Sequence, residues 1–218
     1  MPHQVILVGA SGLIGSHLLT ALIESAEISR ILLILRRPLN ITNPKVRELI
    51  VNFDELEQYA LEIKGDIIYS CLGTTTAATP DSNLYRKIDL EYPLNLARIG
   101  AENGIRQFHL VSSMGANVNS SSSYLKLKGE LEEKLKELSL GSLHIYQPSL
   151  LTGNRREYRL GEKIAAPIFK LIEPLLIGPL KKYRSIKAET VARAMLNQSL
   201  KEIKGTFIYP SIQIQELA

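Results

Sequence analysis

The stretch QVILVGASGLIG, residues 4–15, decides the fold of this chain. Its first half, Val5–Val8, is a short apolar run of the kind that forms a strand buried on both faces of a sheet. Gly9, Gly12 and Gly15 follow at three-residue intervals, and residues 16–26 carry apolar side chains at helical spacing. A strand, a glycine turn and a helix in this order predict a site that binds a dinucleotide.

Each glycine of this turn has a separate expected role. Gly9 permits the tight turn, Gly12 lets the backbone approach a pyrophosphate, and Gly15 lets the helix pack closely on the strand. The helix that begins near Gly12 would point its unpaired N–H groups and the positive end of its dipole at the phosphates. The spacing G-x-x-G-x-x-G resembles that of the short-chain dehydrogenases and reductases. The alternative is a glycine-rich turn that binds no ligand.

The length and composition of the chain predict one globular domain. Its 218 residues suffice for a sheet covered by helices on both faces, and its 45% apolar and 22% charged residues are ordinary proportions. The net charge of +4 gives little reason to expect nucleic acid, and no stretch approaches the roughly 20 apolar residues that span a membrane. The four histidines show no metal-ligand spacing. A single cysteine and the lack of a secretory leader before the first strand predict a cytoplasmic protein without disulfides.

Apolar runs and helical segments alternate along the rest of the chain. Further strands are expected at Ile31–Leu35, Leu49–Val51, Asp66–Cys71, Gln107–Ser112, Leu143–Tyr146 and Thr206–Tyr209. Helices are expected at residues 55–63, 80–103 (interrupted near Asp89 and Pro93), 122–138, 160–172 and, as the final helix, 188–200. This alternation predicts an α/β fold, a doubly wound parallel sheet of the NAD(P)-binding Rossmann type over residues 1–218. The part from about residue 153 is expected to form a small C-terminal lid.

Two arginines follow the second strand, where NAD-binding folds carry an acidic residue that binds the adenosine ribose. A carboxylate would repel a 2′-phosphate, whereas Arg36 and Arg37 could clamp it and stack on the adenine. The sequence therefore favours NADP(H) over NAD as the cofactor, although one of the two arginines could simply be solvated. Asn52 and Phe53 follow the third strand, where the protein would contact the edge of the cofactor's adenine ring. Gly73 would let its loop pass close to the cofactor ribose, or mark a plain turn.

A serine, a tyrosine and a lysine are the expected catalytic residues. Tyr124 and Lys128 are four residues apart on a predicted helix and so share one face. Ser113 follows the carboxyl end of a strand, where ligands of such sheets bind. Tyr124 would donate a proton to a substrate carbonyl that Ser113 polarises, while Lys128 would stabilise the phenolate and hold the nicotinamide ribose. The alternative is a chance pair.

The other face of this predicted helix carries mostly charged side chains. They are expected to form a solvated surface and are Glu130, Glu132, Glu133, Lys136 and Glu137.

Several motifs together resemble those of the atypical short-chain dehydrogenases related to the Tat-interacting tumour-suppressor oxidoreductase. They are GASGLIG, CLGTT, VSSMGA, YLKLKGELE and QPSLLTG…RREYRLGE, and they extend over nearly the whole chain. The resemblance implies an NADP-binding Rossmann fold with a catalytic Ser113, Tyr124 and Lys128, and with Ser112 as the other candidate serine. It also implies cofactor contacts at Gly9, Ser11, Gly12, Leu13, Ile14, Gly15, Arg36, Arg37, Leu72, Gly73, Ser149 and Leu150. Gln147 departs from the family, whose members commonly have arginine before this proline.

Three functions fit these observations. The first is an NADPH-dependent reductase of a small carbonyl compound, in which Arg155 and Arg159 contact an anionic group of the substrate or lie at the surface. The second is a redox-sensing regulatory protein that binds NADPH and reports it to a protein partner. The third, a nucleoside-diphosphate-sugar epimerase-like enzyme, ranks lowest because it needs a larger C-terminal substrate domain. We expect a monomer or a homodimer.

Overall fold

A seven-stranded parallel sheet forms the centre of the protein. The computed structural model describes residues 2–74, 79–153 and 183–218. The strands are β1 (His3–Val8), β2 (Ile28–Leu35), β3 (Val46–Ile50), β4 (Ile67–Ser70), β5 (Gln107–Val111), β6 (Ser142–Gln147) and β9 (Gly205–Pro210). Their order across the sheet is β3-β2-β1-β4-β5-β6-β9, and every neighbouring pair is parallel. The predicted doubly wound parallel sheet is confirmed.

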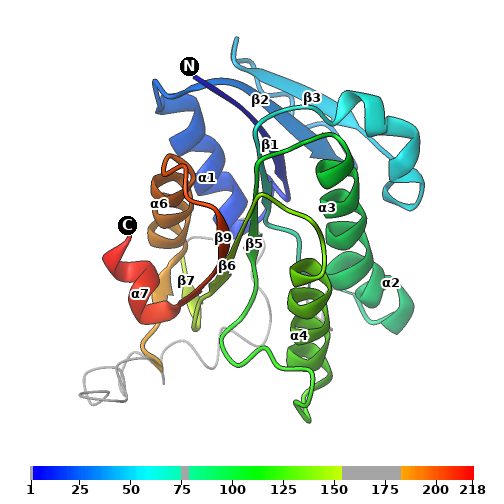
Figure 1. The fold of residues 1–218 in the computed structure, drawn as a ribbon, viewed down its shortest axis with the longest axis vertical. Coiled ribbons are helices and arrows are strands. Elements are labelled where there is room, and N and C mark those ends of the chain that lie inside the picture. The colour runs from blue at the N-terminus through cyan, green and yellow to red at the C-terminus, as the bar shows by residue number, and fades with distance from the viewer. Residues whose placement is uncertain (1, 75–78, 154–182) are drawn as a thin grey trace.

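Helices cover both faces of this sheet (Figure 1). On one face lie α1 (Leu13–Glu24), α6 (Ala188–Ser199) and α7 (Ser211–Glu216). On the other lie the 3₁₀-helix η1 (Phe53–Glu62), α2 (Ser82–Arg86), the π-helical turn η2 (Lys87–Glu91), α3 (Tyr92–Glu102) and α4 (Ser123–Lys136).

The alternation of side chains along β1 divides the core into two layers. Ile6 and Val8 point toward the layer with α3 and α4, whereas Val5 and Leu7 point toward the layer with α1 and α6. All four are at most 2% exposed. The apolar run that predicted a strand buried on both faces therefore forms one, and it anchors the glycine turn that follows.

The structure differs from the expected elements mainly in the C-terminal third. The helix at Ala188–Ser199 is not the final one, because α7 follows β9. Two short strands, β7 (Leu151–Thr152) and β8 (Ile186–Lys187), form a separate parallel pair. Arg155, Arg156, Arg159 and the helix expected at residues 160–172 lie outside the described residues.

Histidine and tyrosine side chains of the neighbouring strands β5, β6 and β9 stack on one another in the interior. His109 and His144 stack with their ring centroids 4.3 Å apart, and each ring nitrogen has a hydrogen-bond partner. Burial lowers the pKa of both histidines, that of His144 to about 4, so both rings are neutral at pH 7. Within the described ranges, no group of three or more His, Cys, Asp or Glu side chains could hold a metal ion.

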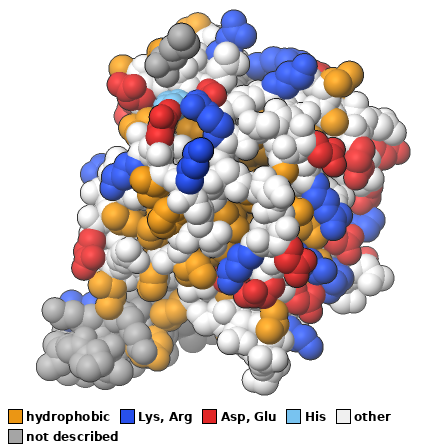
Figure 2. Space-filling model, in the orientation of Figure 1, with side chains coloured by type: hydrophobic (Ala, Val, Ile, Leu, Met, Phe, Trp, Pro, Cys, Tyr) orange, Lys and Arg blue, Asp and Glu red, His pale blue; other side chains and the backbone are white. Residues whose placement is uncertain are grey.

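The surface in Figure 2 shows hydrophobic side chains near its centre, where the edge strand β9 and its neighbour β6 lie in Figure 1, and charged side chains over the helices at the right. Among the helices of the described residues, none is both long and apolar enough to cross a membrane.

Because the strands are all parallel, their carboxyl ends meet at one edge of the sheet. From β1 the chain adds β2 and β3 in one direction, then crosses back and adds β4 on the other side of β1, so the order of the strands reverses between β1 and β4. In open α/β sheets, ligands bind outside the strand ends at such a switch point. The turns after β1, β2, β4, β5 and β6 therefore form the candidate site.

Candidate cofactor-binding and active site

The glycine turn after β1 is packed too tightly for side chains at two of its three glycines. Gly9 has a φ of +79°, and a Cβ there would lie 2.5 Å from the carbonyl oxygen of Cys71. A Cβ on Gly15 would lie 2.1 Å from the carbonyl oxygen of Gly9. Gly15 thus packs against the turn itself. A Cβ on Gly12 would meet only the Gly9 oxygen, at 3.2 Å, so the protein leaves room beside this residue.

That room lies at the start of α1. Gly12 is the N-cap residue of α1, no side chain caps the helix, and its first turn carries no acidic residue. The first amides of an α-helix have no acceptor within the helix, so Leu13 and Ile14 present N–H groups here. Ser11 beside them is exposed. Free amides, the positive helix end and an absent Cβ together fit the pyrophosphate of a dinucleotide.

The two arginines lie at the carboxyl end of β2, and both are exposed. Among the described residues, neither Arg36 nor Arg37 forms an ion pair, so both charges remain available to an anion. The charge of Arg36 acts on Tyr92, whose pKa is raised to about 12 by burial and by its hydrogen bond to Asp54. Leu35 at the end of β2 pairs with Ile50 at the end of β3, so Arg36 lies close to the end of β3.

The side chains after β3 form contacts within the protein. The side chain of Asn52 caps η1 by accepting a hydrogen bond from the Asp54 amide, and Phe53 is only 5% exposed. Any contact of Phe53 with an adenine would therefore involve its backbone. Asp54 accepts hydrogen bonds from Lys87 Nζ (2.8 Å) and from the Tyr92 hydroxyl (2.9 Å). Its negative charge is thus compensated locally.

The loop after β4 lies beside a buried ion pair. A Cβ on Gly73 would lie 3.5 Å from Asp89 Oδ1 and 3.6 Å from Lys128 Nζ, and Leu72 is half-buried. The amide of Thr74 donates a hydrogen bond to Asp89 Oδ2 at 2.8 Å. The Gly73 loop, expected near a cofactor ribose, is therefore anchored on the group that also holds Lys128.

Lys128 and Asp89 form this ion pair, with Nζ 2.9 Å from Oδ1 and side chains 4% and 0% exposed. Burial is the largest single effect and would lower the pKa of Lys128, but the charges of Asp89, Tyr124 and Glu132 and the direct contact with Asp89 together outweigh it. The pKa of Lys128 therefore lies above its usual value, and the side chain is protonated at neutral pH. Asp89 belongs to the π-helical turn η2, a feature often found at functional sites.

Sequence reasoning missed Asp89 as a site residue, although it did expect an interruption of the helix there. The only signal was an acidic residue inside the apolar run Ile88–Leu90. Such a residue is buried only when it has a partner.

The two candidate serines after β5 differ in their surroundings. Ser112 is 4% exposed, and its hydroxyl donates a hydrogen bond to Glu132. Ser113 is half-buried, and no other described residue contacts its hydroxyl by a hydrogen bond. Ser113 is therefore the serine whose hydroxyl is available to a ligand.

Glu132 is not part of a solvated surface, contrary to the sequence-based expectation. It is 4% exposed and accepts hydrogen bonds from Ser112 and from Gln147. Glu133 and Glu137, by contrast, are exposed as expected.

The residues after β6 have mixed roles. Ser149 is 8% exposed, and its hydroxyl donates to the Arg184 carbonyl and shares a 2.8 Å hydrogen bond with Ser211. The Ser149 hydroxyl thus already has hydrogen-bond partners within the protein, so any contact of Ser149 with a cofactor would involve its backbone. Leu150 is 37% exposed at the same edge of the sheet.

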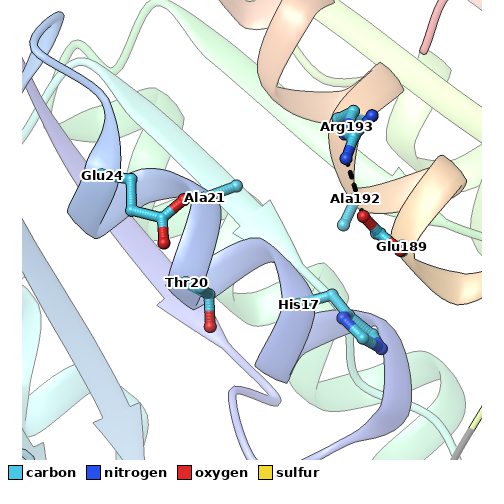
Figure 3. A pocket seen from close by; sticks show the side chains of 7 residues that line it. All are labelled: His17, Thr20, Ala21, Glu24, Glu189, Ala192 and Arg193. Atoms are coloured by element: carbon cyan, nitrogen blue, oxygen red, sulfur yellow. Dashed lines mark hydrogen bonds and ion pairs between the residues drawn. The ribbon is translucent and has the colours of Figure 1, made fainter.

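A separate shallow pocket of about 130 Å³ lies between α1 and α6 (Figure 3). His17, Thr20, Ala21 and Glu24 line it from α1, and Glu189, Ala192 and Arg193 from α6. Arg193 and Glu189, both on α6, are ion-paired at 2.7 Å on one side of the pocket. None of the expected site residues lines this pocket.

Comparisons with known proteins identify the family of this chain. The sequence profile of the NAD dependent epimerase/dehydratase family matches residues 5–207. The rat (Rattus norvegicus) protein HTATIP2 is 34% identical over 198 residues, which cover 89% of this chain and 80% of that protein. The Aspergillus niger protein fmp52, mitochondrial, is 31% identical over 209 residues, 93% of this chain and 89% of that protein. The resemblance inferred from the motifs is confirmed.

Solved structures show the same fold. MoeE5 in complex with UDP-glucose and NAD superimposes with a TM-score of 0.72 at 16% identity, covering 94% of this chain and 75% of that chain. The Bordetella bronchiseptica enzyme WbmH in complex with NAD+ gives a TM-score of 0.71 at 15% identity, covering 96% and 75%.

The predicted cytoplasmic location is wrong by the same comparisons. Several fungal relatives, from Aspergillus niger, Aspergillus fumigatus and Coccidioides immitis, are named mitochondrial proteins. A low cysteine content fits any reducing compartment, so it could not select the cytoplasm.

The buried ion pair makes a testable prediction about stability. Lys128→Met leaves Asp89 buried without a counter-charge and is expected to lower the free energy of unfolding by about 3–5 kcal/mol at pH 7. Adding Asp89→Asn removes the orphaned charge and should restore most of that loss. Urea unfolding of the single and double variants measures both effects. Lys126→Met, an exposed change on the same helix, is the control. Equal stability of Lys128→Met and the control would contradict the pairing.

Proposed function

Because the chain belongs to the NAD dependent epimerase/dehydratase family, we propose that it is an NADP(H)-dependent oxidoreductase that reduces a small carbonyl compound. One observation carries this proposal. The glycine turn, the Gly73 loop and the buried Lys128 all lie at the switch point of the sheet, and Tyr124 lies one helical turn before Lys128. A cofactor cradle and a candidate proton donor thus share one edge of the sheet.

The preference for NADP(H) rests on charge. Arg36 and Arg37 follow β2 without an ion pair in the described part of the chain, and the nearby Asp54 carboxylate is compensated by Lys87. A dianionic 2′-phosphate would gain charge-assisted hydrogen bonds from guanidinium groups, whereas the hydroxyl of NAD would gain much less.

The proposed reaction assigns one step to each polar side chain. When bound, NADPH supplies the hydride that adds to the carbonyl carbon. The electron pair of the C=O bond moves to the oxygen, which takes the phenolic proton of Tyr124, and the phenolate is then reprotonated from water. Ser113 donates a hydrogen bond to the same oxygen and stabilises its developing charge. Lys128, kept protonated by Asp89, holds the ribose and offsets the phenolate charge.

The cofactor preference is tested by titrating the protein with NADPH and NADH in parallel. NADPH is expected to bind at least about tenfold more tightly, because a charge-assisted hydrogen bond is worth about 1.5–3 kcal/mol. Arg36→Ala and Arg37→Ala should each remove much of this difference. Arg30→Ala, an exposed change on the same strand, should leave it intact. Tighter binding of NADH by the unmodified protein would refute the argument from the two arginines.

The proton donor is tested by Tyr124→Phe, which keeps the ring and removes the hydroxyl. We expect turnover of aldehydes and ketones, followed by loss of NADPH absorbance, to fall at least about a hundredfold. Tyr59→Phe, a half-buried tyrosine on η1, is the matched control. Full activity of Tyr124→Phe would eliminate this acid. NADPH binding without turnover of any carbonyl compound would favour the redox-sensing alternative, and turnover of a nucleotide sugar would favour the epimerase-like one.

A further inference from the structure

A buried carboxylate ties three elements of the site together. Glu132 lies on α4 one helical turn beyond Lys128 and is 4% exposed. Its Oε1 accepts a hydrogen bond from the Ser112 hydroxyl, at the residue after β5. Gln147 Nε2, at the last residue of β6, lies 3.0 Å from both carboxylate oxygens of Glu132. In each of these hydrogen bonds Glu132 is the acceptor, which is the only role that an ionised carboxylate can take.

A carboxylate at this position is costly to bury. Burial raises the pKa of Glu132, against the lowering effects of Ser112, Gln147 and Lys136, and Glu133 adds to the rise. A raised pKa means that folding disfavours the ionised form, so at neutral pH the charge costs stability. An apolar side chain at such a place is often neutral or stabilising. The charge of Glu132 therefore does not itself stabilise the fold.

The contacts of Glu132 do have a consequence for the site. Ser112 precedes Ser113, and Gln147 lies just before Ser149 and Leu150, where the resemblance implies contacts with the cofactor. The two turns are also joined directly, because the Met114 amide donates to the Pro148 carbonyl at 3.0 Å. The carboxylate thus connects both turns to the helix that carries Tyr124 and Lys128.

We propose that Glu132 is a positioning residue whose carboxylate clamps the turns after β5 and β6 onto α4 and so fixes Ser113 relative to Tyr124 and Lys128. The catalytic part of this inference rests on the proposed function. The clamp itself is a property of the fold and can be tested without any substrate.

The clamp is tested by hydrogen exchange of backbone amides. Glu132→Leu removes the acceptor, and we expect exchange at Met114 to accelerate at least about tenfold while amides of β1 keep their wild-type rates, because only local opening is affected. Glu132→Gln retains one acceptor oxygen and can pair with the Gln147 amide, so it should stay close to wild type. Glu133→Leu, the same change at the exposed neighbour, should have no effect. Wild-type exchange at Met114 in Glu132→Leu, or equal acceleration throughout the sheet, would overturn the clamp.

The catalytic consequence is tested on the same variants. Glu132→Leu is expected to lower kcat at least about tenfold, since small misplacements of reacting groups are costly, while the Kd for NADPH changes less than about threefold. Glu132→Gln should recover most of kcat, and a value as low as that of Glu132→Leu would contradict the acceptor role. If Glu132→Leu does not fold, Ser112→Ala and Gln147→Ala remove the clamp from the other side. If the wild type reduces no carbonyl compound, the proposed function fails, and exchange at Met114 still decides the clamp.

Discussion

The candidate site depends on the contact between two backbone turns, one after β1 and one after β4. Gly9 allows this contact, because a Cβ at that residue would lie 2.5 Å from the Cys71 carbonyl oxygen. The contact brings the start of the loop of Leu72 and Gly73 beside the turn that leads into α1. Gly73 in turn lies against the ion pair of Asp89 and Lys128. A steric constraint at one glycine thus determines how close the candidate cofactor site lies to the charged groups on α4.

Helix α4 then organises the charges of the site. Its lysine and its buried glutamate, one turn apart, are each held by residues from elsewhere in the chain: Asp89 holds Lys128, and Ser112 and Gln147 hold Glu132. Both side chains are buried and held by these contacts, so their conformations are restricted. Groups fixed before the substrate arrives need no reorganisation during a reaction, which is how enzymes stabilise developing charge efficiently. The cost is the burial of three ionisable groups, Lys128, Asp89 and Glu132, each of which loses the solvation that water would provide.

The sequence was sufficient for the sheet and the glycine turn, because each depends on local patterns. Apolar runs of β-branched residues gave the strands, and the spacing of Gly9, Gly12 and Gly15 gave the turn. The contacts of Lys128 and Glu132 could not be predicted in this way. Their partners come from distant parts of the chain, and helical spacing does not say which charged residues face the core. The strands β7 and β8 and helix α7 span two, two and six residues, too few to show a periodicity.

The central claim is that the start of α1 binds the pyrophosphate of a nicotinamide dinucleotide. Backbone amide NMR during titration with NADPH tests it most directly. The amide signals of Ser11, Leu13 and Ile14 should shift in a saturable way, and more than those of the remote helix α6, because these N–H groups would acquire phosphate oxygens as acceptors. Unchanged signals at these three residues under saturating NADPH, or the largest shifts along α6, would contradict the account.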